Sequence, residues 1–171
     1  MTVKNILRTD APAAVLFVRL AVGFTFMVAG SGKLRDLSST TGFFEGIGFP
    51  APTELAAMVG VFEVLGGALV LIGLATRIAV LPLIIIMIMA LLSTKLPTLV
   101  GGPVGPFAAP RGPNVGLAAF LNASRLDFSM LMTTIFLLIV GAGRISLDAR
   151  LSRPVPRNAG RVAHRSDADG G

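Results

Sequence analysis

Four long apolar stretches constrain the fold of this chain more than any other feature. A helix that spans the hydrocarbon core of a bilayer needs about 20 mostly apolar residues. The sequence reaches or nearly reaches that length four times, and we expect helices at about residues 12–34, 54–75, 76–94 and 127–145. Charged residues make up 14% of the chain, compared with about 25% in soluble domains. We therefore predict an all-α fold, an integral membrane four-helix bundle.

Cysteine and histidine usage excludes several kinds of redox centre. The chain has no cysteine, which excludes iron–sulfur clusters, thiolate metal sites and thiol catalysis. Its one histidine, His164, lies in a polar stretch near the C-terminus, so no imidazole is available inside the membrane to hold haem or copper. We expect no metal site and no intrinsic cofactor.

The distribution of positive charge predicts how the chain is oriented. With four spans, both termini lie on one side of the membrane, and that side carries nine Lys and Arg residues, against five on the other: Lys4, Arg8, Arg77, Arg144, Arg150, Arg153, Arg157, Arg161 and Arg165, against Lys33, Arg35, Lys95, Arg111 and Arg125. Positive residues mark the cytoplasmic side. We expect both termini in the cytoplasm of a bacterium, in a multi-pass protein of the plasma membrane.

The same reasoning divides the chain into three parts. Residues 1–11 are predicted to be a cytoplasmic N-terminal segment, 12–151 the membrane domain, and 152–171 a disordered basic cytoplasmic tail. The net charge of +6 does not indicate nucleic acid, because six of the 15 Lys and Arg residues lie in the last 28 residues, beside a membrane segment. Such a cluster more often contacts anionic lipid. We expect membrane lipid as one partner, together with a protein partner or self-association.

Two charged residues lie inside the predicted helices. A charge near the bilayer centre costs at least about 2.5–3.5 kcal/mol, so Arg19 and Glu63 must pair or reach water. At a rise of 1.5 Å per residue the two lie at depths that differ by about 8 Å, which makes pairing possible. They form either a structural ion pair or a polar ligand pocket in which Glu63 handles a proton.

Small residues and flanking charges suggest how the helices pack. Gly23, Gly30 and Gly32 in the first helix, and Gly60, Gly66 and Gly67 in the second, permit a close approach of helices. Lys33 and Arg77 lie at opposite ends of the bundle and are predicted to be interface anchors whose charged groups snorkel to water.

The connections differ in length and character. The turn around residues 73–77 is short and predicts antiparallel neighbours. Three phenylalanines within residues 43–49 suggest a short amphipathic element at the interface. The connection 94–127 is rich in proline and glycine, which excludes a long helix. Its apolar piece, 115–121, is too short to span the membrane and is compatible with a surface position, a dip into the membrane or a cap on the bundle.

Six short motifs, in order, resemble those of the DoxX family. They cover about residues 15–151 and read Arg19-Leu20-x-x-Gly23, Gly30-x-x-Lys33-Leu34, Gly48-Phe49-Pro50-x-Pro52, Glu63-x-x-Gly66-Gly67, Gly73-Leu74-x-Thr76-Arg77 and Gly141-x-Gly143-x-x-Ser146-Leu147-Asp148. The resemblance implies a DoxX-like four-helix membrane domain over 12–151. Some family members resemble subunits of quinone-linked oxidoreductases, and others look like membrane partners of oxidative-stress enzymes.

Three functional hypotheses follow. The first is a membrane subunit of a quinone-linked oxidoreductase system, in which Arg19 and Glu63 line a quinone-head pocket and a partner supplies electrons. The second is a non-catalytic scaffold that anchors a partner at the membrane. The third, a small transporter, is the least favoured, because the sequence offers one charge pair and no interrupted helix at the midplane.

Overall fold

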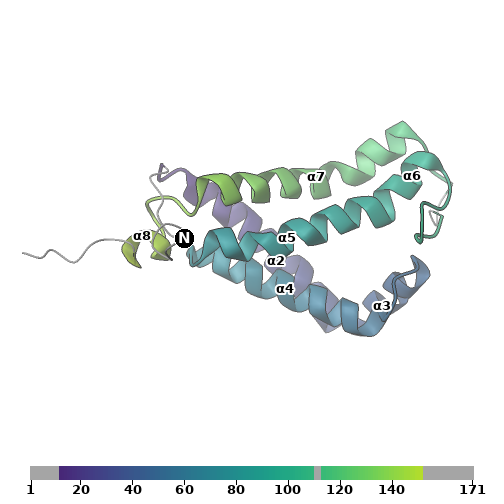
Figure 1. The fold of residues 1–171 in the computed structure, drawn as a ribbon, viewed down its shortest axis with the longest axis horizontal. Helices are drawn as coiled ribbons and strands as arrows, with labels where there is room; N and C mark the ends of the chain where they lie inside the picture. Colours follow the sequence, from purple (N-terminus) through teal and green to yellow (C-terminus); the bar gives the residue numbers. More distant parts are fainter. Residues whose placement is uncertain (1–11, 110–112, 152–171) are drawn as a thin grey trace, which may run out of the picture.

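The computed structural model describes residues 12–109 and 113–151, and about three quarters of these residues are helical. The predicted segments 1–11 and 152–171 lie outside it. Figure 1 shows the elements, which are, in chain order, α2 (Val15–Arg35), α3 (Leu37–Gly46), α4 (Pro52–Ile72), α5 (Thr76–Ala90), the π-helical turn η1 (Leu91–Lys95), α6 (Leu96–Val100), α7 (Leu117–Val140) and α8 (Leu147–Leu151).

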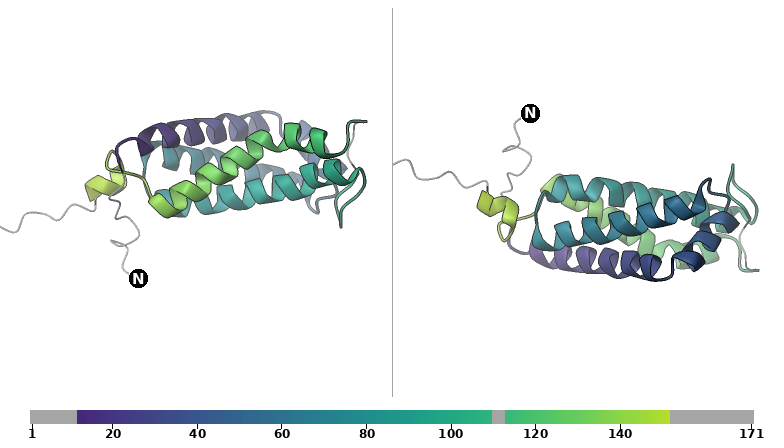
Figure 2. Two further views of the ribbon diagram at one scale, coloured as in Figure 1. Left: turned by 90° about the horizontal axis from the view of Figure 1, so that it is seen from above. Right: turned by 90° about the horizontal axis from the view of Figure 1, so that it is seen from below.

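Four helical segments are long and apolar enough to cross a membrane, which confirms the predicted all-α fold with four spans. They are 15–35, 52–72, 76–100 and 117–140, of which the third joins α5, η1 and α6. The four segments run side by side along the long axis of the molecule (Figure 2). A Cβ on Gly143 would lie 3.0 Å from that of Val15, so the segment after α7 meets the start of α2 at one end of the bundle.

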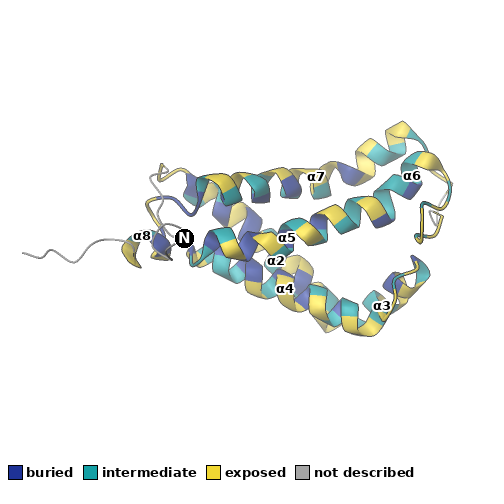
Figure 3. Cartoon of the chain, in the orientation of Figure 1, coloured by how far each residue is buried: buried dark blue, intermediate teal, exposed yellow. Residues whose placement is uncertain are grey.

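The outward surfaces of these helices are apolar, as lipid requires. Phe17, Phe24, Ile85 and Ile139 are each more than 60% exposed. Figure 3 shows exposed residues along the outer faces of all four long helices. In water such a surface would cause aggregation, whereas in hydrocarbon it is the stable arrangement.

Glycines form the contact between α2 and α4. A Cβ atom on Gly67 would lie 2.7 Å from the carbonyl oxygen of Gly23, and one on Gly30 would lie 2.7 Å from the carbonyl oxygen of Gly60. The two glycines of each helix are seven residues apart, or two helical turns, so they face the same neighbour. This seam fixes the antiparallel register of α2 and α4.

The other glycines that were predicted to pack have different surroundings. Gly66 faces α5, where an added Cβ would lie 3.0 Å from Leu83. Gly32 does not contribute, since nothing lies within 4 Å of the position that its Cβ would take. The prediction for Gly32 was wrong because it lies on the outer face of α2.

The turn between α4 and α5 is as tight as predicted. Gly73 has φ +71° and Ala75 has φ +48°, two left-handed conformations that reverse the chain within three residues. Gly73 ends α4, and its amide donates to the carbonyl oxygens of Leu69 and Val70. Glycine favours this conformation because it has no Cβ.

The phenylalanine-rich segment forms α3, at the end opposite α8 (Figure 1). Phe44 is buried, and its ring lies 5.5 Å from that of Phe49, which in turn lies 5.3 Å from that of Phe107. The amide of Ala108 donates to the carbonyl oxygen of Ile47. The loop between α6 and α7 is therefore held against the C-terminal end of α3 by aromatic packing and by a backbone hydrogen bond.

The third and fourth spans are longer than predicted. The third continues through a π-helical turn at Leu91–Lys95 to Val100, rather than ending at residue 94. Proline at 97 cannot donate to the carbonyl four residues earlier and would clash with it, and a wider turn is one way to accommodate this. The fourth span begins at Leu117 rather than at residue 127, so the piece 115–121 largely belongs to a spanning helix.

We predict that Gly67→Ala destabilises the protein whereas Gly32→Ala does not. Alanine favours a helix by about 1 kcal/mol over glycine, but at position 67 its methyl group would meet backbone atoms of α2 at 2.7 and 2.9 Å. Overpacking of this kind costs about 1–3 kcal/mol. We expect Gly67→Ala to lower the thermal unfolding midpoint in detergent by several degrees. Equal midpoints for the two variants would contradict the glycine seam.

Candidate functional site

Arg19 is buried and donates four hydrogen bonds, all to main-chain carbonyl oxygens. Its Nε donates to Val70 at 2.9 Å and one terminal nitrogen donates to Leu71 at 2.6 Å. The other terminal nitrogen donates to Ala142 at 3.0 Å and to Ile145 at 2.5 Å. Only 2% of the residue is exposed.

These acceptors are main-chain carbonyls at or just beyond the C-terminal ends of two helices. Val70 and Leu71 lie in the last turn of α4, while Ala142 and Ile145 lie just after α7. The last turn of a helix has free carbonyl groups and a partial negative charge, both of which favour a cation. Arg19 therefore joins the C-terminal ends of two helices to α2 without a carboxylate partner in direct contact.

Gly73 provides the space for this guanidinium. A Cβ at this position would lie 2.5 Å from the guanidinium carbon of Arg19. The glycine is thus required twice, by its positive φ and by the close approach of Arg19.

Asp148 closes the same end of the bundle. Its carboxylate accepts from the amide of Ala75 at 2.7 Å and from that of Thr76 at 3.1 Å, which caps the start of α5. Its own amide donates to the carbonyl oxygen of Gly73 at 2.9 Å. Asp148 also interacts electrostatically with Arg19. Asp148 therefore contacts the turn at Gly73 against which Arg19 packs, and it was not predicted as a site residue.

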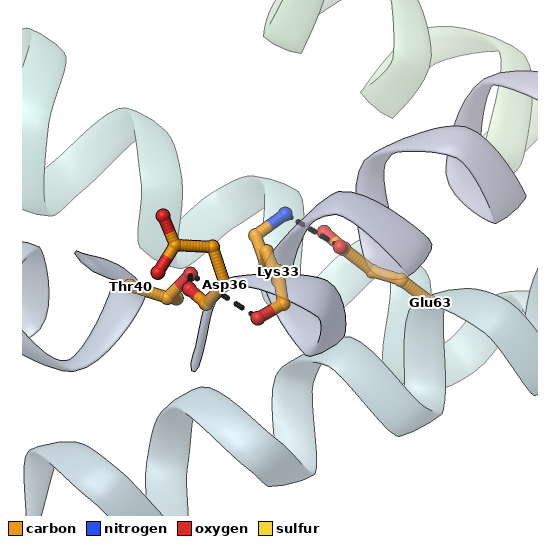
Figure 4. Close-up of polar contacts among 4 residues, drawn as sticks. All are labelled: Lys33, Asp36, Thr40 and Glu63. Atoms are coloured by element: carbon orange, nitrogen blue, oxygen red, sulfur yellow. Dashed lines mark hydrogen bonds and ion pairs between the residues drawn. The ribbon is translucent and has the colours of Figure 1, made fainter. Parts of the chain in front are cut away.

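Glu63 lies deeper in the bundle and pairs with Lys33. Its carboxylate is 2.5 Å from the ammonium group of Lys33 (Figure 4), and the side-chain exposures are 2% for Glu63 and 28% for Lys33. Lys33 was predicted to be an interface anchor, but the structure gives it a contact with a buried carboxylate instead of a position in water alone.

The structure gives Arg19 and Glu63 different partners, main-chain carbonyls for Arg19 and Lys33 for Glu63. Side chains lean toward the N-terminus of their own helix. With α2 and α4 antiparallel in the register of the glycine seam, Lys33 and Glu63 lean toward each other, whereas Arg19 and Glu63 lean apart. The difference in depth alone did not reveal these directions.

A second ion pair lies close to the first. Lys95, in the π-helical turn, is 3.3 Å from Asp127 of α7, and about a quarter of each side chain is exposed. Asp127 also interacts electrostatically with Glu63. Each of the four spans thus contributes one charged residue, and the group of Lys33, Glu63, Lys95 and Asp127 is hereafter the charged cluster.

The surroundings of the charged cluster are also polar. Ser93 in the π-helical turn and Ser124, about one turn before Asp127, are both buried. Turns of the π type within α-helices are frequent at functional sites. Two ammonium groups, two carboxylates and nearby hydroxyls provide hydrogen-bond donors and proton acceptors at membrane depth, which can bind a polar head group and exchange protons with it.

Lys95, Asp127 and Asp148 were not predicted as site residues. Lys95 and Asp127 each lie at the edge of an apolar run, where a charge usually marks the end of a membrane helix, and Asp148 was noted only within the last DoxX-like motif. The signal that was available is that Lys95 and Asp127 have opposite charges and flank the same connection. The remaining predicted residue, Arg77, donates to the carbonyl oxygen of Ile139 at 3.0 Å.

No group of three or more His, Asp or Glu residues able to hold a metal ion is found within residues 12–109 and 113–151.

Comparisons with known proteins place the chain among membrane proteins. The family model of DoxX matches residues 14–96, a segment that contains Arg19, Lys33, Glu63 and Lys95. The "Uncharacterized membrane protein Rv3486" of Mycobacterium tuberculosis is 42% identical over 151 residues, which are 87% of this chain and 88% of that protein.

Two further relatives are more distant. The "Putative oxidoreductase CatD" of Bacillus subtilis is 29% identical over 133 residues, 78% of this chain and 83% of the relative. The "Inner membrane protein YphA" of Escherichia coli is 30% identical over 145 residues, 81% of this chain and 91% of the relative. No solved structure matches the chain significantly.

We predict that Arg19→Lys destabilises the protein by about 2–5 kcal/mol, since lysine has one nitrogen and cannot reach four carbonyls, and each buried carbonyl left without a partner costs about 1–3 kcal/mol. Unfolding by denaturant in mixed micelles measures this. Arg35→Lys, at an exposed position of α2, is the matched control. Equal stability of the two variants would show that Arg19 does not hold the helix ends.

We predict that Lys33→Met costs about 2–4 kcal/mol and that adding Glu63→Gln restores much of it. Removing one partner of a buried pair leaves an uncompensated charge, whereas removing both does not. The same unfolding assay on both single variants and the double variant gives the coupling energy. A double variant that is no more stable than Lys33→Met would mean that Glu63 does not depend on Lys33.

Proposed function

Because the chain belongs to the DoxX family of membrane proteins, we propose that it is the membrane subunit of a quinone-linked oxidoreductase system and that the charged cluster binds the quinone head group. The protein lies in the bacterial plasma membrane with both termini in the cytoplasm. The name of the Bacillus subtilis relative supports the reaction class, and the charged cluster supports the location of the site.

One observation carries the proposal: four spanning helices each place one charge in the same region of the bundle. If Glu63 had only a structural role, one counter-charge would be enough, because the largest free-energy cost comes from a buried charge without a partner. Four charges from four helices instead create a polar site of zero net charge that lipid-soluble molecules can reach. Partial exposure of Lys33, Lys95 and Asp127 makes such access possible.

The chain's own residues have separate tasks at this site. A quinone, when bound, accepts two electrons and two protons. The ammonium groups of Lys33 and Lys95 would donate hydrogen bonds to the carbonyl oxygens of the head group. The carboxylates of Glu63 and Asp127, ionised while paired, would accept protons from water and pass them to a reduced head group. Electrons come from a protein partner, because the chain has no cysteine and no histidine within its spans.

The structure bears differently on the transporter and scaffold hypotheses. Two ion pairs and a π-helical turn in the third span favour a small transporter more than the sequence did. A non-catalytic scaffold would use the basic tail 152–171, which lies outside the described residues. Both remain distinguishable from the proposed function, since neither requires bound quinone.

We predict that protein purified from native membranes in mild detergent carries quinone in near-stoichiometric amount and that Glu63→Gln lowers this by about tenfold. Loss of the carboxylate frees Lys33 from its position, and one charge-assisted hydrogen bond is worth about that factor. Mass spectrometry of extracted lipids, with protein quantified in parallel, gives the ratio. Glu54→Gln, at an exposed position of the same helix, is the control.

Three outcomes decide the matter. Quinone lost from Glu63→Gln alone supports the proposal. Quinone absent from the wild type, with a soluble enzyme present in equal amount, supports the scaffold instead. Quinone retained equally by all three proteins removes the charged cluster from quinone binding.

A further inference from the structure

A second polar site lies at the other end of the bundle, where α2 begins and α4 ends. A cavity of about 470 Å³ opens there between these helix ends and the C-terminal segment. Three arginines line it: Arg19, Arg144 and Arg150. It is separate from the charged cluster and takes no part in the proposed quinone binding.

The cavity is strongly positive. No carboxylate lines it. The nearest acid in the sequence, Asp148, already accepts hydrogen bonds from the amides of Ala75 and Thr76. Arg144 and Arg150 are exposed, and neither forms an ion pair with any residue in the described part of the chain. Two guanidinium groups are therefore available to an anion, above a third that is buried.

The rest of the lining is apolar. Leu16, Ile72, Ile145 and Leu147 surround the arginines, and the last three are between 38% and 53% exposed. Ile72 is the last residue of α4 and Leu16 is the second of α2, so the cavity lies at the level where the spans leave the hydrocarbon. A small soluble anion gains nothing from apolar side chains around its site. An amphiphile can place its charged group among the arginines and its hydrocarbon chain against these apolar side chains.

We propose that this cavity binds the phosphate head group of an anionic phospholipid. Arginine suits phosphate because its planar fork donates paired hydrogen bonds and is weakly hydrated. Exposed apolar side chains of α4, Ile72 at the cavity and Leu65 about two turns before it, provide a path for the acyl chains. Anionic lipids are enriched in the cytoplasmic leaflet, where the excess of positive residues places this end of the bundle.

Lipid bound here also acts on the fold. The cavity is bounded by residues 144–150, the segment that supplies Ile145 to Arg19 and Asp148 to α5. A ligand that binds only the folded state stabilises it in proportion to its occupancy. Anionic lipid therefore holds the C-terminal segment against the ends of the spanning helices.

The test compares lipid binding by the delipidated full chain in detergent. The probes are phosphatidylglycerol, phosphatidylcholine with the same acyl chains, and inorganic phosphate, each followed by native mass spectrometry and by the thermal unfolding midpoint. The variant Arg144→Gln/Arg150→Gln removes the two exposed guanidinium groups. The control Arg35→Gln/Arg125→Gln removes two exposed arginines elsewhere, so the net charge is equal.

We expect phosphatidylglycerol, but not phosphatidylcholine, to bind the wild type and raise its unfolding midpoint. The Arg144→Gln/Arg150→Gln variant should bind it about 30-fold more weakly, and the control should bind normally. A photoactivatable phosphatidylglycerol should label residues 144–150, which tests the location without any substitution. Equal binding of the two lipids, equal loss in both variants, labelling elsewhere, or inorganic phosphate binding as tightly as the lipid would each overturn the proposal.

Discussion

The burial of Arg19 among helix ends is the interaction on which the rest of the structure depends. A guanidinium inside a membrane needs acceptors, and here they are main-chain carbonyl oxygens in the last turn of α4 and just after α7. Gly73 must lack a Cβ for the guanidinium to fit, and the chain after α7 must turn back across the bundle to bring its carbonyls into reach. Asp148, on that returning segment, then caps α5. All four spans are joined at one point by a single cation and a single carboxylate.

The charged cluster offsets the cost of burying charge in the membrane in a different way. Instead of satisfying a charge with main-chain carbonyls, it balances two ammonium groups against two carboxylates. The glycine seam between α2 and α4 links the two regions, since it sets the register that points Lys33 at Glu63 and turns Arg19 toward the helix ends. One region is fully engaged in holding the bundle together, and the other is partly exposed. That contrast is why the charged cluster, and not Arg19, is the better candidate for chemistry.

Much of the fold could be predicted from the sequence, and rather less of the site. Hydrophobic length identified the four spans, and spacing identified Gly23, Gly30 and Gly67 as packing residues, because both signals are local. Asp127 and Ser124 were assigned to a connection because polar residues ordinarily end a membrane helix. Within the bundle, Asp127 pairs with Lys95 and Ser124 is buried, so α7 continues through them. The free-energy cost of burying these two polar side chains is offset by contacts within the bundle, which a local sequence pattern does not reveal.

The sequence by itself determined that the chain is helical, that it has four spanning segments and that Arg19 and Glu63 must find partners. These conclusions follow from the thickness of a bilayer and from the cost of a charge inside it. Only the tertiary structure decided which partners they find. That choice depends on the register between antiparallel helices and on the lean of each side chain toward its own N-terminus. Neither quantity belongs to one segment alone, because both arise when two helices pack against each other.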